Sequence, residues 1–165
     1  VYAGALRTNV AALLRTVTLG EKAVRTSSEL FAITADVNLL LGHIAGEDYA
    51  CDAPDGAKKD CEGAARRLAR VVCCDMEELS MDDILELARQ AYRRQVDDLK
   101  EGIGQVAGHH GLKGAIVCGA GDFIAMDALR EIGMPFSKVS GEYGEGISRV
   151  FPAYAVARLL SMEQR

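Results

Sequence analysis

The fold class is decided by the stretch Gly114-Ala115-Ile116-Val117-Cys118-Gly119-Ala120-Gly121-Asp122-Phe123. Residues 115–118 form a wholly apolar run bounded by glycines, which is typical of a strand buried on both faces of a parallel sheet. A turn follows at residues 119–121, and residues 122–132 are predicted to form a helix that ends at Gly133, where a left-handed residue belongs. The stretch therefore predicts an α/β protein in which a sheet is flanked by helices.

A small-molecule site is expected at this turn. Two glycines let a ligand approach the backbone, and the N-terminus of the following helix offers unpaired N–H groups. The turn lacks the third glycine of the dinucleotide fingerprint. Asp122 at the helix start would occupy those N–H groups and repel a phosphate, so we expect a ribose or base here. The expected binding residues are Gly119, Ala120, Gly121, Asp122 and Phe123. A tight strand-to-helix turn without a ligand explains the glycines equally well.

Outward from this stretch the chain divides into three parts. Residues 1–27 are predicted to be β-rich, with a hairpin turn at Gly20-Glu21. Residues 28–110 are predicted to be a helical insertion interrupted by an acidic loop. Asp60 is expected to cap one of its helices, and Ser80-Met81-Asp82-Asp83 fits a capping box at the start of the next. Residues 111–165 carry the strand, the turn and the helix of the nucleotide-type site, with a neighbouring strand over residues 136–140. Ser148 is expected to cap a last helix, with Pro152 in its first turn.

Charge and cysteine content exclude several classes of function. The net charge is −5 and no basic block is present, which excludes a nucleic-acid partner. Two clusters of arginines lie among acids and are interpreted as solvated helix faces: Arg66, Arg67 and Arg70, and Arg89, Arg93 and Arg94. The five cysteines have no CxxC spacing, so a reducing cytoplasm is expected. No apolar stretch approaches the ~20 residues of a membrane span.

Three further groups of polar residues are candidates for binding. Arg7-Thr8 follows a strand-like run and could clamp an anion, although a surface turn would look the same. Asp36 lies off the apolar stripe of a helix predicted to begin at Ser28, so its default position faces solvent. The acidic loop with Asp52 and Asp55 could bind Mg²⁺ through carboxylate oxygens, but a solvated turn is the simpler interpretation. No catalytic residue is assigned.

Taken together, four ordered segments resemble a known family. The segments are Tyr2-Ala3-Gly4-Ala5-Leu6-Arg7-Thr8, Ile33-Thr34-Ala35-Asp36-Val37-Asn38, Tyr49-Ala50-Cys51-Asp52-Ala53-Pro54-Asp55-Gly56, and residues 114–123 with Ser148-Arg149-Val150. They are similar to the C-terminal half of the hydantoinase A-like proteins of tetrahydromethanopterin-linked one-carbon metabolism. In methanogens this group includes the methanofuran-biosynthesis synthase that forms the aminomethylfuran–tyramine-glutamate ether.

The resemblance implies both a fold and an activity. The fold is a ribonuclease H-like lobe of the actin-like ATPase superfamily, with the Gly119 turn at the position of the adenosine motif. The activity is that of a transferase, which condenses an aminomethylfuran-methyl diphosphate with the phenol of tyramine-glutamate and releases pyrophosphate, with Mg²⁺ as cofactor. One wall of the site would be formed by Arg7, Thr8, Asp36, Asp52 and Asp55.

The chain also departs from the family pattern. Family members carry two Asp-Gly phosphate loops upstream of the segment matching Tyr2, whereas this chain begins at Val1 in mid-pattern without them. We therefore expect an incomplete cytoplasmic enzyme whose partners are its substrates and an N-terminal lobe of the same protein, with homo-oligomerisation left open. The alternatives are an ATP-binding ATPase or kinase of the same superfamily, and a non-catalytic lobe.

Overall fold

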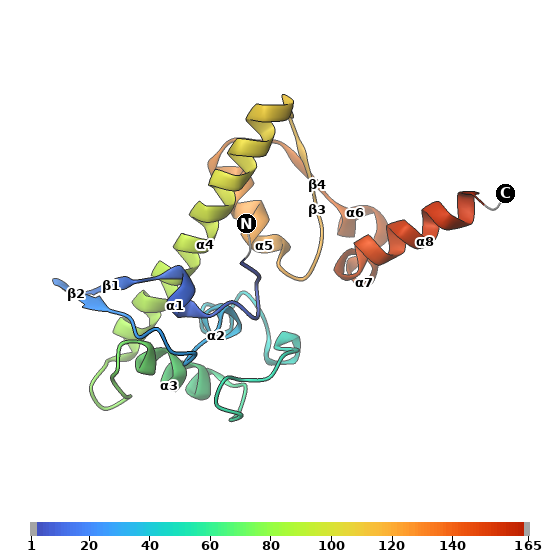
Figure 1. Cartoon of the computed structure of the whole chain (residues 1–165). Helices are drawn as coiled ribbons and strands as arrows, with labels where there is room; N and C mark the ends of the chain where they lie inside the picture. The colour runs from blue at the N-terminus through green and yellow to red at the C-terminus, as the bar shows by residue number, and fades with distance from the viewer. Residues whose placement is uncertain (1–2, 164–165) are drawn as a thin grey trace. The chain divides into compact units, whose positions relative to one another are not determined.

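The computed structural model describes residues 3–163, and the chain divides into two compact units, Val1–Asp98 and Leu99–Arg165 (Figure 1). The first unit contains α1 (Val10–Leu13), β1 (Thr16–Leu19), β2 (Lys22–Arg25), α2 (Thr34–Leu40), the 3₁₀ helix η1 (Gly46–Asp48), α3 (Cys61–Val71) and most of α4 (Met81–His110). The second contains β3 (Ala115–Val117), α5 (Asp122–Glu131), β4 (Phe136–Lys138), α6 (Val139–Tyr143), α7 (Glu145–Arg149) and α8 (Phe151–Glu163). The architecture is therefore mixed α/β, with small sheets and many helices. Within residues 3–163, no helix combines the length and apolar character that crossing a bilayer requires.

Polar side chains begin the two main helices of the first unit. The Asp60 carboxylate accepts a hydrogen bond from the Gly63 N–H at 2.8 Å and caps α3. Ser80 and Asp83 form a capping box at the start of α4, in which each side chain accepts a hydrogen bond at 3.2 Å from the other residue's N–H. Both caps are the ones that the sequence predicts.

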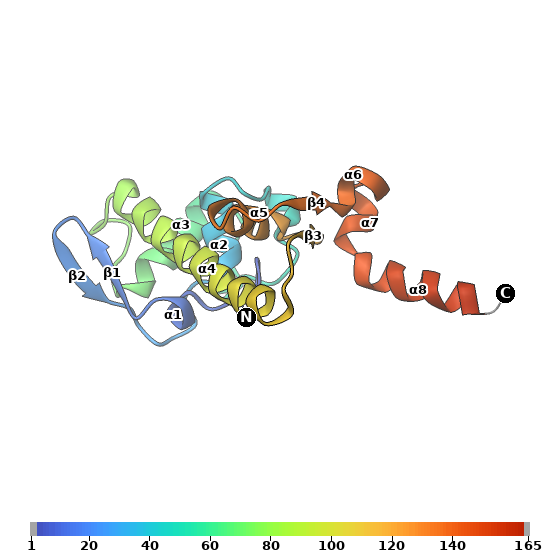
Figure 2. The ribbon, with the colours of Figure 1, turned by 90° about the horizontal axis from the view of Figure 1, so that it is seen from above.

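The start of the chain contains less β structure than predicted. The hairpin at Gly20-Glu21 is confirmed, since β1 and β2 pair antiparallel from Thr16 opposite Arg25 to Leu19 opposite Lys22 (Figure 2). Before it, however, α1 forms where strand was expected, because Asn9 caps it by accepting a hydrogen bond from the Ala11 N–H at 3.0 Å.

The helix predicted to begin at Ser28 begins instead at Thr34. The preceding residues are extended, because Ile33 forms an antiparallel bridge with Asn9 and the Val10 N–H donates to the Ala32 carbonyl at 3.0 Å. Pairing with a distant segment thus overrides the local helical pattern.

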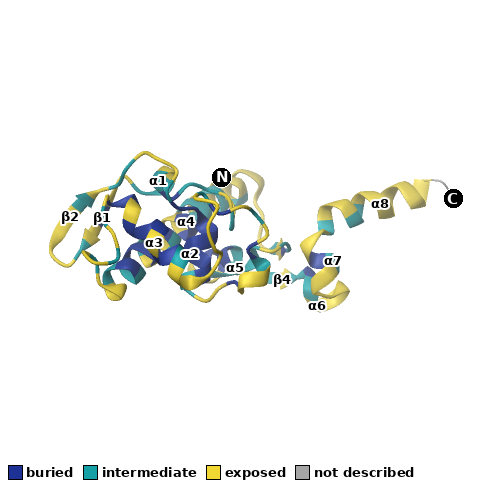
Figure 3. Cartoon of the chain, turned by 90° about the horizontal axis from the view of Figure 1, so that it is seen from below, coloured by how far each residue is buried: buried dark blue, intermediate teal, exposed yellow. Residues whose placement is uncertain are grey.

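The apolar core of the first unit lies between its helices and the hairpin (Figure 3). It includes Val17 of β1, Leu68 of α3 and Ile84 of α4, which are all at most 1% exposed. Buried alanines of α3 and α4, among them Ala65 and Ala88, belong to the same core. This core holds α2 and the loop after it, where several of the predicted site residues lie.

In the second unit, β3 and β4 form a parallel pair. Ala115 lies opposite Phe136 and Val117 opposite Lys138, and α5 provides the connection between the strands. Gly133 follows the C-cap of α5 and has a φ of +69°, the left-handed conformation that the sequence predicts for it. The predicted strand, turn, helix and neighbouring strand are therefore confirmed.

The prediction that this strand is buried on both faces is wrong. Val117 is 4% exposed, but Ile116 on the opposite face is 73% exposed. Among the described residues β3 belongs to a two-stranded sheet, with α5 packed against it. One face of β3 therefore stays open. Ser148, predicted to cap the last helix, lies within α7, while Pro152 occupies the first turn of α8 as expected.

Candidate functional site

A buried ion pair organises the first unit. Asp36 on α2 and Arg67 on α3 both have fully buried side chains. The Oδ1 atom of Asp36 accepts hydrogen bonds from Nε of Arg67 at 2.9 Å and from Nη2 at 2.7 Å. Its Oδ2 atom accepts from the Ile33 N–H at 3.0 Å, which also caps α2. Every acceptor of the buried carboxylate thus has a donor, which is the condition for tolerating such a charge.

Two side chains of the loop between α2 and α3 join this pair. The Tyr49 hydroxyl donates a hydrogen bond to Oδ1 of Asp36 at 2.8 Å. Burial, with the nearby Asp36 carboxylate, raises the pKa of the Tyr49 phenol far above its usual value, so the phenol stays protonated and donates. Nη1 of Arg67 donates to Oδ1 of Asp55 at 3.0 Å and to the Lys58 carbonyl at 3.2 Å.

Asp55 sits at the solvent edge of this network, with a side chain that is 25% exposed. Its Oδ2 atom also pairs with Nη1 of Arg70 at 3.2 Å. Partial burial raises the pKa of Asp55, but the Ala57 N–H and the Arg67 charge outweigh it and hold the pKa below its usual value. The network of Asp36, Tyr49, Asp55 and Arg67 therefore ties α2, the following loop and α3 together.

Two expectations about these residues are wrong. Asp36 does not face solvent, and Arg67 is not part of a solvated helix face, because both side chains are completely buried. Their positions on a helical wheel cannot reveal this, since Tyr49 and Asp55, which bind them, belong to a loop outside both helices. Arg66 and Arg70 of the same cluster are 58% and 49% exposed, as predicted.

A cavity of about 380 Å³ lies beside this network. It is lined by Arg7, Leu30, Ile33, Ala50, Cys51, Asp52 and Pro54. The structure thus brings Arg7 and Asp52, two candidates 45 residues apart in the sequence, to one site. Leu30 and Ile33 supply apolar surface between them. Such a cavity suits a ligand with an anionic group and an apolar body.

The segment that carries Arg7 is held by hydrogen bonds to the start of α2. The Thr8 N–H donates to Oγ1 of Thr34 at 3.2 Å, and the Thr34 N–H donates back to the Thr8 carbonyl at 2.9 Å. Oγ1 of Thr8 accepts from the Gly4 N–H at 2.8 Å. Thr8 therefore positions Arg7, and it is not among the residues that line the cavity.

The two predicted metal ligands lie in different environments. Asp52 is exposed and lines the cavity, whereas both carboxylate oxygens of Asp55 pair with guanidinium groups. Asp55 would have to leave Arg67 and Arg70 to bind a cation, so it does not fit the predicted role. Among residues 3–163 there is no group of three or more His, Cys, Asp or Glu side chains that could hold a metal ion.

The glycine turn of the second unit has an open backbone. Gly119 has a φ of +105°, and a Cβ built on it would meet no atom within 4 Å. Its N–H lies 3.5 Å from Oγ of the buried Ser148. Asp122 does not occupy the N–H groups of α5 as expected, because its carboxylate pairs with Nζ of Lys138 at 3.2 Å. The exposed Ala120 and the half-buried Gly121 and Phe123 complete the turn.

A second cavity of the first unit was not predicted. It lies along one side of α4 and includes Arg89 and Arg93, which are exposed, as predicted for a solvated helix face. The signal in the sequence is Arg89 followed by Tyr92 and Arg93, since spacings of three and four residues place both on the same side of a helix as Arg89.

Comparison with known proteins identifies related chains. The family model described as hydantoinase/oxoprolinase matches residues 1–163. The (4-{4-[2-(gamma-L-glutamylamino)ethyl]phenoxymethyl}furan-2-yl)methanamine synthase of Methanocaldococcus jannaschii is 38% identical over 163 residues, which cover 99% of this chain and 49% of the relative. The protein of the same name from Methanococcus vannielii is 34% identical over 167 residues, covering 99% of this chain and 75% of the relative. The chain thus spans about half the length of the first relative and three quarters of the second.

Proposed function

The chain belongs to the hydantoinase/oxoprolinase family, and from this premise we propose that it forms part of an ether-forming synthase of methanofuran biosynthesis. The observation that carries the proposal is the similarity to two relatives named for the same ether product across 99% of this chain. The cavity lined by Arg7 and Asp52 supports the proposal, because the reaction needs a site for an anionic leaving group beside apolar surface.

The proposed reaction is a transfer of an aminomethylfuran-methyl group from diphosphate to a phenol. The bond between the methylene carbon and the diphosphate oxygen breaks, and its electron pair leaves with pyrophosphate. The phenol oxygen of tyramine-glutamate forms the new bond to that carbon and loses its proton to solvent. The product is the phenoxymethylfuran linkage that the relatives' names describe.

In this proposal Arg7 binds the diphosphate, because a guanidinium group pairs well with phosphate oxygens. Leu30 and Ile33 provide apolar surface for the furan ring. Asp36, Thr8 and the Asp55–Arg67 pair are positioning residues, which hold the two cavity walls in place through the contacts described above.

The proposed role of Mg²⁺ depends on Asp52 and not on Asp55. Mg²⁺ is often held by one or two carboxylates together with substrate phosphates and water, and Asp52 offers one such carboxylate at the cavity. When bound, the ion would neutralise charge on the leaving diphosphate. Asp55 stays with its arginine partners.

We further propose that the remaining part of the active site comes from another lobe of the same protein, acting in the cytoplasm. The coverage of about half of the Methanocaldococcus relative supports a second lobe. The parallel β3–β4 pair, its helical connection α5 and the open Gly119 turn are consistent with a ribonuclease H-like lobe of the actin-like ATPase superfamily. The turn residues 119–123 would then contribute to the substrate site of the assembled enzyme.

The experiment incubates the full natural polypeptide containing these residues with the furan diphosphate, tyramine-glutamate and Mg²⁺. Mass spectrometry and phosphorus NMR follow the ether and pyrophosphate, which we expect in equal amounts. Arg7→Ala is expected to lower kcat/KM for the diphosphate about tenfold to a hundredfold, since a hydrogen bond to a charged group is lost. Arg25→Ala, an exposed arginine of β2, is the matched control.

Two results would contradict the proposal in different ways. Hydrolysis of ATP without any ether would favour the ATPase or kinase alternative. Ether formation with an unchanged kcat/KM in Arg7→Ala would remove Arg7 from the site while leaving the reaction intact.

A further inference from the structure

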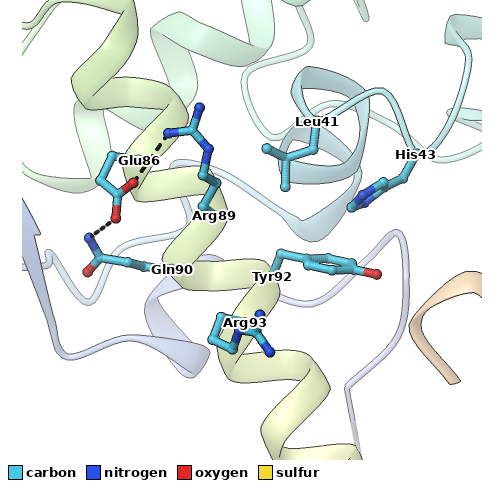
Figure 4. A pocket seen from close by; sticks show the side chains of 7 residues that line it. All are labelled: Leu41, His43, Glu86, Arg89, Gln90, Tyr92 and Arg93. Carbon is cyan, nitrogen blue, oxygen red and sulfur yellow. Dashed lines mark hydrogen bonds and ion pairs between the residues drawn. The ribbon is translucent and has the colours of Figure 1, made fainter. Parts of the chain in front are cut away.

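The second cavity of the first unit has the size and composition of a ligand site. Its volume is about 450 Å³, within the usual range for small-molecule pockets. The lining residues come from α4 and from the end of α2 and the turn after it (Figure 4): Leu41, His43, Glu86, Arg89, Gln90, Tyr92 and Arg93. Neither Arg7 nor Asp52 belongs to it, so it is distinct from the cavity assigned to the diphosphate.

Apolar and aromatic side chains form one wall of this cavity. Leu41 and Tyr92 are half-buried and pack against the core of the unit. The His43 ring lies 4.3 Å from the Tyr92 ring at an angle of 48°. Nδ1 of His43 is 3.2 Å from Oδ1 of Asn38, whose side chain is completely buried. The two rings are therefore held in a tilted arrangement and offer aromatic surface to a ligand.

Charged side chains of both signs form the other wall. Arg89 and Arg93 lie one turn apart on α4, which places their Cβ atoms roughly 5–6 Å from each other. Glu86 is one turn earlier, and it pairs with Nη1 of Arg89 at 3.3 Å. Both side chains of this pair are about half exposed, at 57% and 46%, so a ligand can exchange for the pair at little cost.

Gln90 fixes this wall relative to the hairpin. Its Nε2 atom donates to the Thr18 carbonyl at 2.7 Å, and its Oε1 atom accepts from the Thr18 N–H at 2.9 Å. Nε2 also contacts Oε1 of Glu86 at 3.0 Å. Glu86 is therefore held by Gln90 as well as by Arg89, so a carboxylate remains at this position whatever Arg89 binds.

We propose that this cavity binds the amino-acid head of an aromatic γ-glutamyl amide. Arg89 and Arg93 take its α-carboxylate, Glu86 takes its α-ammonium, and the ring of the ligand packs against Tyr92 and His43. The inference rests on the proposed function, because the product named for the relatives carries a γ-glutamylamino group linked through an ethyl chain to a phenyl ring. In such an amide the α-amino and α-carboxyl groups are free.

The charge pattern favours this ligand over a nucleotide or a free diphosphate. A polyphosphate would meet two cations but also the fixed Glu86 carboxylate, which repels it. A zwitterionic head instead matches a wall with charges of both signs. The apolar wall accounts for the aromatic part of the ligand, which neither phosphate nor free glutamate would use.

Calorimetric titration with γ-glutamyltyramine tests the inference without requiring turnover. Wild-type protein is expected to bind it about tenfold to a hundredfold more tightly than tyramine, which lacks the amino-acid head. The double variant Arg89→Ala/Arg93→Ala should abolish this preference. Arg94→Ala is the matched control, because Arg94 lies on the same helix, is 56% exposed and pairs with Asp98 outside the cavity.

Glu86→Gln tests the ammonium contact separately. Wild-type protein should prefer γ-glutamyltyramine to its N-acetyl derivative, and Glu86→Gln should reduce that preference. Circular dichroism establishes that each variant is folded. An unchanged affinity and an unchanged preference for γ-glutamyltyramine over tyramine in the double variant would overturn the inference, as would competitive displacement of the ligand by ATP at this cavity.

Failure of this inference and failure of the proposed function give different results. If the double variant makes the ether with an unchanged KM for γ-glutamyltyramine, the cavity assignment is overturned and the reaction stands. If γ-glutamyltyramine binds with the expected dependence on Arg89 and Arg93 but no ether forms with any partner lobe, the cavity assignment is supported and the reaction is rejected.

Discussion

The two units of the chain are stabilised in different ways. Residues 3–98 bury both an apolar core and a set of hydrogen-bonded charges, including the fully buried Asp36 and Arg67. In residues 99–163 the helix α8 has no buried residue, and Ile116 in the centre of β3 is 73% exposed. The first unit therefore depends on contacts between distant segments, whereas the second consists largely of local structure. Substitutions in the two units are therefore expected to differ in their effect on stability.

The largest effect is expected from Arg67→Ala. Removal of the guanidinium leaves the Asp36 carboxylate buried without its main partner, which costs about 3–5 kcal/mol of unfolding free energy. Urea denaturation measures the loss, and hydrogen exchange of α3 amides localises it to the first unit. Arg66→Ala, next to it but 58% exposed, should change stability by less than about 0.5 kcal/mol. Equal effects of the two variants would show that the buried network does not stabilise the unit.

Alanine substitutions of one isoleucine in each unit allow a direct comparison of the two units. Ile84→Ala in the first unit removes a side chain with no exposed surface, and we expect a loss of about 2–5 kcal/mol. Ile116→Ala in the second unit removes one that is 73% exposed, so its effect on unfolding should stay below about 0.5 kcal/mol. Thermal and urea unfolding of both variants provide the comparison. A large loss from Ile116→Ala would mean that its open face is covered in solution.

Substitution of two helical glycines by alanine is expected to change the free energy of unfolding in opposite directions. A Cβ on Gly63 of α3 would collide with the Lys58 carbonyl, which also accepts a hydrogen bond from Arg67, so Gly63→Ala should cost about 1–3 kcal/mol. Gly104 of α4 has open space around it. Gly104→Ala should therefore raise the free energy of unfolding by up to about 1 kcal/mol, because alanine has the higher helix propensity. Differential scanning calorimetry detects both shifts. Stabilisation by Gly63→Ala would contradict the close approach of the loop to α3.

The smallest expected effect is the contribution of Asp55 to the pH dependence of stability. Because its pKa is held below the usual value in the folded protein, its pairing stabilises the fold above about pH 4, and this contribution is lost as pH falls through the lowered pKa. Asp55→Asn should therefore reduce the free energy of unfolding by up to about 1 kcal/mol near neutral pH. As the pH falls, the stability of this variant should decline less steeply than that of the wild-type protein. Urea titrations at several acidic pH values compare the slopes. Identical slopes in both proteins would exclude this linkage.

The elements that the sequence predicts well are the ones specified locally. The caps at Asp60 and Ser80, the hairpin turn at Gly20 and the helix end at Gly133 all appear where expected, because each depends on neighbouring residues. The start of α2 was misplaced because Ile33 pairs with Asn9, a contact that no local pattern reveals.

The candidate site was predictable only as separate pieces. Arg7 and Asp52 were recognised individually, but their shared cavity results from the folding of the loop against α2 and α3. Asp36 and Arg67 were assigned to the surface because helical periodicity treats charged residues as solvated. Their burial follows from mutual pairing and from Tyr49, which a single helix pattern cannot contain.

In the proposed reaction the phenol oxygen of the acceptor attacks the carbon that carries the diphosphate. This step is tested most directly by giving the full polypeptide a γ-glutamyltyramine with a heavy oxygen isotope in its phenol, together with the furan diphosphate. Mass spectrometry of the products is expected to find the heavy oxygen in the ether and none in the released pyrophosphate. Recovery of the heavy oxygen in phosphate or pyrophosphate would show that the phenol itself is phosphorylated, and it would contradict the account.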